Sequence, residues 1–387
     1  MYLEKKNNMV LEDFFIDNTL NLNWDFILKL PHFRDMENTM QNPRWHSEGN
    51  ALEHTRLVCK HALGFMEEDT EKNLHDKRLF MLSALFHDVG KPKTTFKGEK
   101  DGNWHSYGHE NVGSKLAREM LWDWPLYDRE YIVHMVKWHM EPLFFERAKK
   151  PRDVVDKITK TLPYYDIYRL KMCDLEGAIQ EPSCSTKEED RKILERFLII
   201  GEELNNISWL NMFKIGESPY GCSGSLPKFV DDAVEVNVMI GLPGSGKNTF
   251  IENTLIHKMD NPVVLSRDDI RVELGYCSAD EKIVGTNKQE NKVTKIFNER
   301  LLEAIENNRP VILNNINLSA KRRKELKGFL GGKKIRWNYW YIEAPTFKDN
   351  IKRRKGQIPE NVFYNMVQNF EFPEHNEYHS LWVVKQN

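Results

Sequence analysis

The chain has 387 residues, of which 40% are hydrophobic and 29% are charged, and its formal net charge is −2. This composition is typical of an ordinary soluble protein long enough for two or three domains. The five cysteines are scattered without a CxxC pair, which argues against a disulfide framework or a zinc site. No apolar run of about 18 residues occurs, so we expect neither secretion nor membrane insertion, and a cytoplasmic location.

The small net charge conceals an uneven distribution along the chain. Residues 237–387 carry 24 Lys and Arg against 18 Asp and Glu, whereas residues 1–236 carry 32 against 40. A basic C-terminal part suits a polyanionic partner, although solvated surface charge explains an excess of this size equally well.

The N-terminal residues 1–213 are predicted to form an all-α domain. After short helices interrupted at Pro31 and Pro43, apolar residues recur at helical spacing over 51–66, 76–88, 109–122, 128–140, 151–161, 164–180 and 187–206. No alternating strand pattern occurs before residue 234. A stretch rich in Gly, Ser and Pro precedes that point, and we place a linker over 214–233.

The remaining residues, 234–387, alternate predicted strands with predicted helices. The strands are 234–240, 262–266, 310–314 and 337–343, and the helices are 247–258, 289–307, 319–329, 346–353 and 359–369. This alternation indicates a parallel sheet with helices on both faces. The sequence therefore predicts a multidomain protein, with an all-α bundle followed by an α/β domain.

Residues suited to metal binding are spread over several of the N-terminal helices. An apolar helix closes with His87-Asp88 and a Gly-Lys-Pro turn, His109 opens the next helix, and His139 lies on another. Asp174 stands on an otherwise apolar helix, where a buried carboxylate is costly unless it meets a cation. Imidazole and carboxylate ligands together suit divalent ions such as Mn, Fe, Co, Ni or Zn. Any one of these histidines alone is more often a hydrogen-bonded core residue, so the whole set carries the prediction.

This pattern resembles the HD phosphohydrolase superfamily, and in particular the branch seen in tRNA nucleotidyltransferases and phage end-processing proteins. The likeness covers roughly residues 40–180. It implies one metal held by His54, His87, Asp88 and Asp174, with His109 and His139 available to a second metal. It also implies that Lys91 stabilises phosphoryl charge and that metal-activated water attacks a phosphoester. The role of His46 is left open, because this residue either shapes the pocket or caps a helix.

A phosphate-binding loop is predicted where the strand 234–240 ends. Gly-x-x-x-x-Gly-Lys follows the strand and precedes a helix, so backbone N–H groups and the helix N-terminus can face phosphate oxygens while Lys247 reaches the outer phosphates. The residues expected to bind the nucleotide are Gly241, Gly244, Ser245, Gly246, Lys247, Asn248 and Thr249. Asn248 stands where this motif has a Ser or Thr for Mg²⁺.

A second charged motif follows the next predicted strand, at the edge where parallel α/β sheets bind ligands. Asp268 there could accept the proton of a substrate hydroxyl, and Arg271, one helical turn later, could clamp an acceptor phosphate. The alternative for such a charged run is a solvated turn. Further along lie an Asn-x-Asn segment that precedes Arg323, and an Arg-rich cluster before Ile-Pro.

These motifs, in this order, resemble the polynucleotide 5′-hydroxyl kinase family over about residues 236–372. The resemblance implies that Lys247 and the loop backbone hold ATP with Mg²⁺, that Asp268 is the general base, and that Arg271 grips the acceptor's phosphate. It further implies a lid arginine on the γ-phosphate, which is either Arg353 or Arg354.

Three positions within this resemblance have an open role or depart from the family pattern. Arg323 contacts either the nucleic acid or only the surface of its helix. Asn248 departs from the family pattern at the Mg²⁺ position, and Asn315 stands where the family often has an acidic residue ending the strand. Two carboxamides near the metal could mean weak binding of the nucleotide or of Mg²⁺.

Together, the two resemblances imply a bifunctional enzyme that heals broken RNA. An HD-type 2′,3′-phosphatase would be joined to a 5′-kinase, its partners would be ends of RNA or other single-stranded nucleic acid, and a separate ligase would act afterwards. Two alternatives stay open. One is an HD nucleotidase fused to a nucleoside or small-molecule kinase, and the other is a nucleotide sensor with weak catalysis.

Overall fold

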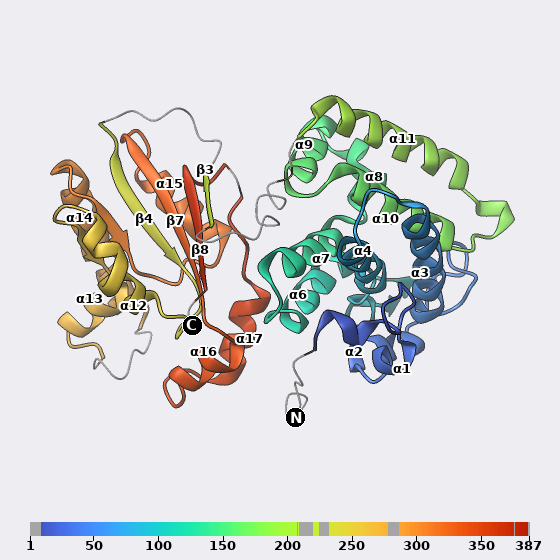
Figure 1. Ribbon diagram of the computed structural model, residues 1–387, viewed down its shortest axis with the longest axis horizontal. Helices are drawn as coiled ribbons and strands as arrows, with labels where there is room; N and C mark the ends of the chain where they lie inside the picture. The colour runs from blue at the N-terminus through green and yellow to red at the C-terminus, as the bar shows by residue number, and fades with distance from the viewer. Residues whose placement is uncertain are drawn as a thin grey trace. The chain divides into compact units, whose positions relative to one another are not determined.

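The computed structural model describes residues 9–206, 208, 220–223, 232–277, 286–374 and 376–385. The chain divides into two compact units, Met1–Ile215 and Gly216–Asn387, of which the first is helical and the second contains the main sheet (Figure 1). Among the described helices, none combines the length and the apolar composition needed to cross a membrane.

The N-terminal unit is a bundle of helices, which confirms the all-α prediction. Its α-helices are α1 (Trp24–Ile27), α2 (Pro31–Arg34), α3 (Ala51–Glu68), α4 (Leu74–Phe86), α5 (Lys91–Thr94), α6 (His109–Met120), α7 (Leu126–Trp138), α8 (Glu141–Phe144), α9 (Pro151–Thr161), α10 (Tyr164–Gly177) and α11 (Lys187–Leu204). The sequence pattern did not indicate a small antiparallel hairpin formed by β1 (Phe96–Lys97) and β2 (Trp104–His105).

Helix α4 forms the centre of this bundle. It begins where the side chain of Asn73 accepts a hydrogen bond from the amide of Asp76, and its residues from 78 to 86 are all buried. Helices α3 and α7 pack against it, and α10 packs against α3. Because α4 is buried on every side, the two residues that follow it, His87 and Asp88, are placed inside the bundle.

Two glycines allow helices to approach each other at backbone distance. A Cβ on Gly90 would collide with the carbonyl oxygen of His109 and would lie 2.6 Å from the amide nitrogen of Gly113. A Cβ on Gly177 would lie 2.8 Å from the side chain of Val58. The first contact joins the start of α5 to α6, and the second joins the end of α10 to α3. Helices that carry the predicted metal ligands are therefore held close together.

The C-terminal unit is an α/β domain, as predicted. Its strands are β3 (Tyr220–Ser223), β4 (Val234–Ile240), β5 (Val263–Leu265), β6 (Val311–Leu313), β7 (Ile335–Glu343) and β8 (Ser380–Lys385), in the sheet order β3-β8-β7-β4-β6-β5. The last five strands in this order are parallel, and β3 is antiparallel to β8. Strands β3 and β8 were not among those predicted from the sequence. The expected linker 214–233 lies outside the described residues, except for β3 and residues 232–233.

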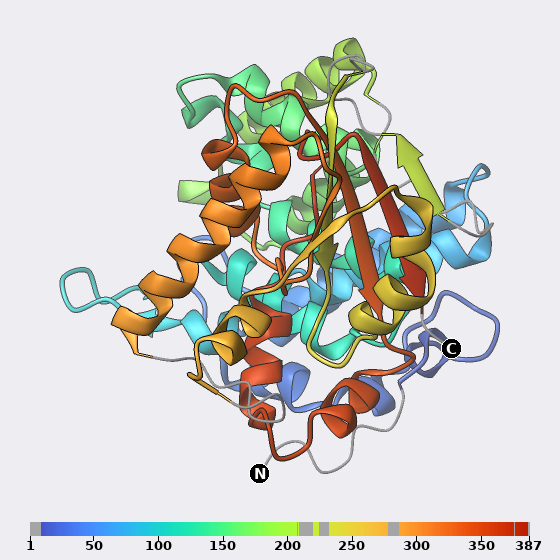
Figure 2. The same cartoon turned by 90° about the vertical axis from the view of Figure 1, so that its left-hand side faces the viewer.

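The helices of this unit are α12 (Lys247–Phe250), α13 (Arg267–Glu273), α14 (Asn287–Glu306), α15 (Ala320–Phe329), α16 (Phe347–Arg353) and α17 (Glu360–Gln368). The long helix α14 lies alongside the strands of the sheet (Figure 2). The predicted helix 247–258 is instead α12 followed by a π-helical turn (Ile251–Leu255) and a 3₁₀ turn (Ile256–Lys258). Ile251 and Leu255 from this turn pack against residues of β4, β6 and β7, which fixes the phosphate loop to the centre of the sheet.

Candidate functional site

The predicted metal ligands of the N-terminal unit converge on one point, with Asp88 at its centre. Its Oδ2 atom lies 3.2 Å from Nε2 of His87 and 3.7 Å from Nε2 of His54. Its Oδ1 atom lies 3.2 Å from Nε2 of His109 and 4.0 Å from Nε2 of His139. One carboxylate therefore faces histidines from four different helices or helix ends.

These side chains form two groups of metal-binding size that share Asp88. One group is His54, His87 and Asp88, and the other is Asp88, His109 and His139. Asp174 joins the first group, since its Oδ1 atom lies 2.9 Å from Nε2 of His54 and 3.8 Å from Nε2 of His87. Asp88 could therefore contribute to both groups if each held a divalent ion, which would supply Lewis acidity there.

Three of the histidines are oriented by the backbone. His87, His109 and His139 each donate from Nδ1 to the carbonyl oxygen three residues earlier, at 2.7, 2.8 and 2.7 Å. A carbonyl can only accept, so Nδ1 carries a proton in each ring and Nε2 is the nitrogen that faces the centre of the site. His87 and His139 are the C-caps of α4 and α7, where helix carbonyls lack partners of their own.

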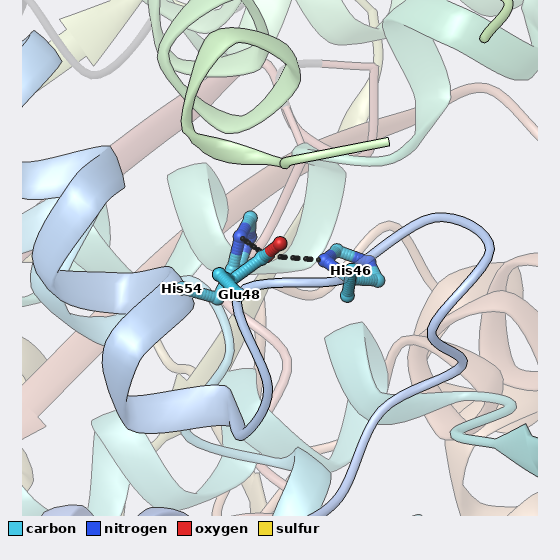
Figure 3. Close-up of side chains that lie close together, drawn as sticks. All are labelled: His46, Glu48 and His54. Atoms are coloured by element: carbon cyan, nitrogen blue, oxygen red, sulfur yellow. Dashed lines mark hydrogen bonds and ion pairs between the residues drawn. The ribbon is translucent and has the colours of Figure 1, made fainter. Parts of the chain in front are cut away.

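His54 is oriented by Glu48, a residue that the sequence analysis did not select (Figure 3). Oε1 of Glu48 accepts hydrogen bonds from Nδ1 of His54 at 2.9 Å and from Nδ1 of His46 at 2.8 Å. Its Oε2 accepts from the amide of Ile179 at 2.9 Å, just after α10. The open question about His46 is thus answered, because it belongs to the pocket and Asn50 caps α3 instead.

These contacts shift the pKa values of the three groups. Burial alone would raise the pKa of Glu48, but the hydrogen bonds from His46 and His54 lower it well below its usual range. Burial alone would lower the pKa of His54, and the hydrogen bonds to Asp174 and Glu48 raise it instead. For His46, burial and the nearby charge of Lys91 lower the pKa to about 4.

Two buried lysines border the cluster. Nζ of Lys91 lies 2.6 Å from Oδ2 of Asp88 and 2.6 Å from Oε1 of Gln41. Nζ of Lys171, which the sequence analysis missed, lies 2.6 Å from Oδ2 of Asp174. Burial alone would raise the pKa values of Asp88 and Asp174. His87 and Lys91 instead hold the pKa of Asp88 well below its usual range, and Lys171 and His54 do the same for the pKa of Asp174. Both carboxylates are therefore ionised and ready to bind a cation.

The donor set fits a divalent metal ion. Nε2 of His87 and Oδ2 of Asp88 are buried, and neither makes a hydrogen bond of acceptable geometry among the described residues, although Oδ2 has its ion pair with Lys91. Buried polar atoms are normally satisfied, so atoms like these at the centre of a nitrogen and oxygen cluster point to a ligand. Nitrogen and oxygen donors suit Mn, Fe, Co, Ni or Zn.

The phosphate loop of the C-terminal unit has the expected backbone shape. Gly244 and Gly246 have φ values of +76° and +94°, a conformation that glycine adopts without strain. Nζ of Lys247 donates to the carbonyl oxygens of Gly241 and the next residue, at 2.9 and 2.8 Å. Oγ of Ser245 is buried, and no described residue bonds to it. The loop thus presents N–H groups at a helix N-terminus, where anions bind.

The Mg²⁺ position of this loop carries an amide pair. Oδ1 of Asn248 accepts a hydrogen bond from Nδ2 of Asn314 at 3.1 Å, and the neighbouring Thr249 is exposed. Asn315 lies elsewhere, since its Oδ1 accepts from the amide of Arg267 at 3.1 Å. The side chain that faces Asn248 from the end of β6 is therefore Asn314, one residue before the position singled out in the sequence.

Asp268 and Arg271 lie together on α13. Oδ1 of Asp268 is 2.6 Å from Nη1 of Arg271, whose Nε and Nη2 atoms donate to both oxygens of Glu290 at 2.7 and 2.8 Å. The side chain of Asp268 is 44% exposed whereas that of Arg271 is 10% exposed. Asp268 is therefore open to a substrate, and Arg271 is held in place by α14. No local motif marks Glu290 in the sequence.

Of the two candidate lid arginines, Arg353 contacts the phosphate loop. Its Nη1 atom donates to the carbonyl oxygen of Gly244 at 3.1 Å, and Nδ2 of Asn350 donates to the carbonyl oxygen of Pro243 at 3.1 Å. Arg354 instead bonds to Gln357, within its own segment, at 3.0 Å. Helix α16 is thus attached directly to the loop.

Arg323 requires a correction. Its side chain is fully buried, and it donates to both oxygens of Glu377 at 2.6 and 3.0 Å. It also donates to the carbonyl oxygens of Asn317 and Leu318, both at 3.1 Å. Arg323 therefore joins the turn after β6 to the C-terminal segment, and its burial argues against a contact with the acceptor. The sequence could not reveal this, because its partner lies 54 residues away.

Comparisons with known proteins place each unit in a domain family. An HD domain matches residues 51–166, and an AAA domain matches residues 236–373. The chain therefore contains an HD domain with a His/Asp metal cluster and a P-loop domain of the AAA type.

Similar individual proteins cover only part of the chain. It is 39% identical over 69 residues to the CC-adding tRNA nucleotidyltransferase of Thermus thermophilus, which covers 17% of this chain and 16% of the relative. It is 28% identical over 160 residues to the A-adding tRNA nucleotidyltransferase of Deinococcus radiodurans, which covers 41% of this chain and 34% of the relative. The chain thus spans about a third or less of the length of these curated relatives.

Two solved structures of a Pnkp1/Rnl/Hen1 RNA repair complex contain chains with distant similarity. Both are 20% identical to this chain, with TM-scores of 0.29 and 0.31. The matches cover 35% and 37% of this chain, and 44% and 49% of the other chains.

Proposed function

We propose that this chain, which joins an HD domain to a P-loop domain, is a bifunctional enzyme that heals the ends of broken RNA. The P-loop domain would transfer the γ-phosphate of ATP to a 5′-hydroxyl, and the HD domain would remove a 2′,3′-cyclic or 2′-phosphate. The observation that supports this proposal is the presence in one chain of a buried His/Asp cluster of metal-binding size around Asp88 and of a phosphate loop followed by Asp268 and Arg271.

In the HD domain, His54, His87, Asp88 and Asp174 would hold one metal, and Asp88, His109 and His139 would hold a second. Bound divalent ions supply Lewis acidity and lower the pKa of water, so that it attacks a phosphoester near neutral pH. Lys91 and Lys171 place positive charge beside the two carboxylates. They would stabilise phosphoryl oxygens and limit the charge repulsion between the phosphate and the carboxylates.

In the P-loop domain, the loop N–H groups and Lys247 would bind the phosphates of ATP. Asp268, which is open to solvent, would accept the proton of the 5′-hydroxyl. Arg271, oriented by Glu290, would grip the acceptor's phosphate, and Arg353 would contact the γ-phosphate from the lid. The amide oxygen of Asn248 is the group available to Mg²⁺ at the loop.

RNA is the substrate that the relatives favour. The two curated relatives are named as tRNA nucleotidyltransferases, and their similarity to this chain makes RNA ends the first substrate to test. A ligase needs a 5′-phosphate and a free 3′-hydroxyl, whereas many RNA breaks leave a 5′-hydroxyl and a 2′,3′-cyclic phosphate. One chain with both activities would prepare both ends for a separate ligase.

The test offers the full chain two oligoribonucleotides. One carries a 5′-hydroxyl and is incubated with radiolabelled ATP and Mg²⁺, and the other ends in a 2′,3′-cyclic phosphate and is incubated with Mn²⁺, Co²⁺ or Ni²⁺. We expect Asp268→Ala to abolish only phosphate transfer and Asp88→Ala to abolish only phosphate removal. Asp269→Ala, a change at the exposed neighbour of Asp268, is the matched control and should leave transfer intact.

Other outcomes would support the alternatives. Transfer to nucleosides but not to oligonucleotides would favour a nucleoside or small-molecule kinase fused to an HD nucleotidase. Retention of ATP without transfer would favour a nucleotide sensor, for which the amide pair of Asn248 and Asn314 is a structural reason. Loss of both activities in either aspartate variant would contradict two independent sites.

A further inference from the structure

The hairpin between α5 and α6 carries a cluster of exposed rings. Tyr107 is 72% exposed and Phe96 is 49% exposed. The rings of His105 and Tyr107 are stacked, with centroids 5.1 Å apart and an angle of 18° between their planes. The ring centroid of Phe96 lies 5.6 Å from that of His105 and 6.0 Å from that of Tyr107. We call Phe96, His105 and Tyr107 the ring platform.

The ring platform is ordered by its own contacts. The hydroxyl of Tyr107 lies 3.0 Å from Nδ1 of His105, whose Nε2 lies 3.0 Å from a carboxylate oxygen of Asp101. The hydroxyls of Thr95 and Ser106 lie 2.7 Å apart and join the two arms of the hairpin at its base. The rings are therefore held in a fixed arrangement while much of their surface faces solvent. Exposed apolar patches of this kind commonly mark binding sites.

Both ends of the hairpin are connected to the metal site. Lys91, which pairs with Asp88, lies five residues before Phe96. Tyr107 lies two residues before His109, so their Cα atoms are within about 7 Å of each other. The carbonyl oxygen of Ser106 accepts the hydrogen bond that orients the ring of His109. The ring platform therefore begins beside a metal ligand.

Residues 91–107 carry four lysines against two acidic residues, Glu99 and Asp101, and this small positive excess favours an anionic partner. Lys93, Lys97 and Lys100 are exposed on this segment, and Nζ of Lys97 lies 5.9 Å from the ring centroid of Trp104. Exposed rings beside lysines are the combination that binds single-stranded nucleic acid, because bases stack on the rings and the cations pair with phosphates. Stacking is tolerant of sequence, which suits an enzyme that acts on ends of any sequence.

From these observations we infer that the ring platform binds the bases of a single-stranded nucleic acid next to the terminal phosphate that enters the HD site. This inference rests on the function proposed above, and it names the residues that make the site prefer a polymer to a mononucleotide. Tyr107 and Phe96 supply the stacking surfaces, and the exposed lysines pair with the backbone phosphates.

The experiment compares an oligoribonucleotide that ends in a 2′,3′-cyclic phosphate with a nucleoside 2′,3′-cyclic monophosphate, using the full chain with Mn²⁺. The mononucleotide has no neighbouring bases to stack. We expect Tyr107→Ala and Phe96→Ala each to raise KM for the oligonucleotide about 5- to 150-fold, with little change for the mononucleotide. Tyr107→Trp keeps a stacking surface and should restore the KM of the unmodified chain.

Tyr165→Ala is the matched control. Tyr165 is a 45% exposed tyrosine of the same unit, on α10, and its ring stacks on Tyr168. This variant should keep the KM of the unmodified chain for both substrates. Equal losses on the two substrates for Tyr107→Ala would overturn the inference, because they would indicate a disturbed His109. Unchanged KM for the oligonucleotide would overturn it as well.

A binding measurement separates the inference from the proposed function. Fluorescence anisotropy of a labelled single-stranded oligoribonucleotide is measured with the full chain in EDTA, where no hydrolysis occurs. Weaker binding by Tyr107→Ala than by Tyr165→Ala supports the ring platform even if the HD domain removes no phosphate from either substrate. Equal binding by the two variants refutes the ring platform even if the chain proves to be an RNA phosphatase.

Discussion

Glu48→Gln is the sharpest test of how the metal site is built. Oε1 of Glu48 accepts two histidine hydrogen bonds, at 2.8 and 2.9 Å, and Oε2 accepts one from a backbone amide at 2.9 Å. Glutamine has nearly the same shape but only one accepting oxygen. The substitution therefore leaves the volume of the pocket unchanged and removes one acceptor and the negative charge.

Both possible orientations of the new amide disturb the site. If its NH₂ group replaces Oε2, it meets the N–H of Ile179, and the facing donors cost about 1–3 kcal/mol. If the NH₂ group replaces Oε1, Nδ1 of His54 has to accept, and its proton moves to Nε2, the atom that would bind the metal. Loss of an outer-shell partner of a metal-binding histidine typically lowers metal affinity about 10- to 100-fold, which corresponds to about 1.4–2.7 kcal/mol.

The assay is calorimetric titration of the metal-free full chain with Mn²⁺, together with the Mn²⁺ dependence of phosphate removal. Glu48→Gln should lower the Mn²⁺ affinity about 10- to 100-fold and should leave ATP binding by the other unit unchanged. Glu53→Gln is the matched control, because Glu53 precedes His54 on α3, has a side chain that is 48% exposed, and pairs only with Arg56 among the described residues. Unchanged Mn²⁺ affinity in Glu48→Gln, or an equal loss in Glu53→Gln, would refute the reasoning.

Three further predictions concern the bundle and the loop. Gly90→Ala should destabilise the HD domain by about 1–3 kcal/mol in urea unfolding, because the new Cβ collides with the backbone of His109. Gly64→Ala is the control and should stabilise the domain slightly, because a Cβ at this helical position meets nothing within 4 Å. Burial alone would raise the pKa of Glu130, but two buried arginines lower it to about 2. The ionised carboxylate contributes about 3 kcal/mol to the free energy of unfolding above about pH 4.5, and this contribution is lost as the pH falls toward 2. The free energy of unfolding of Glu130→Gln should therefore depend less on pH between 4.5 and 2 than that of the unmodified chain. Asn248→Ser supplies a hydroxyl to Mg²⁺ and should lower the Mg²⁺ concentration that gives half-maximal kinase activity.

Each of these predictions has a contrary result. Equal stability of Gly90→Ala and Gly64→Ala would show that α5 and α6 can separate without cost. The same pH dependence with and without Glu130 would show that its carboxylate is not ionised in the folded state. A higher Mg²⁺ requirement in Asn248→Ser would show that the amide is the better ligand here.

The sequence by itself determined both domain classes and selected most of the side chains that gather around Asp88. His87-Asp88, His109 and the phosphate loop could be recognised because each lies at a helix end or a strand-to-helix turn, where a few consecutive residues define the backbone. Periodicity located the main helices for the same reason. It missed the edge strand β3 and its neighbour β8, and it could not show that the helix after the phosphate loop contains a π-helical turn.

Only the tertiary structure decided which side chains support these motifs. Glu290 and the ion pair between Arg323 and Glu377 have no local signature. Arg323 follows an Asn-x-Asn segment and looks like a ligand-binding residue in the sequence, yet packing against a segment 54 residues away buries it. Helical and loop motifs depend on neighbours within a few residues, whereas the partner of a charged side chain depends on which distant surfaces the core brings together.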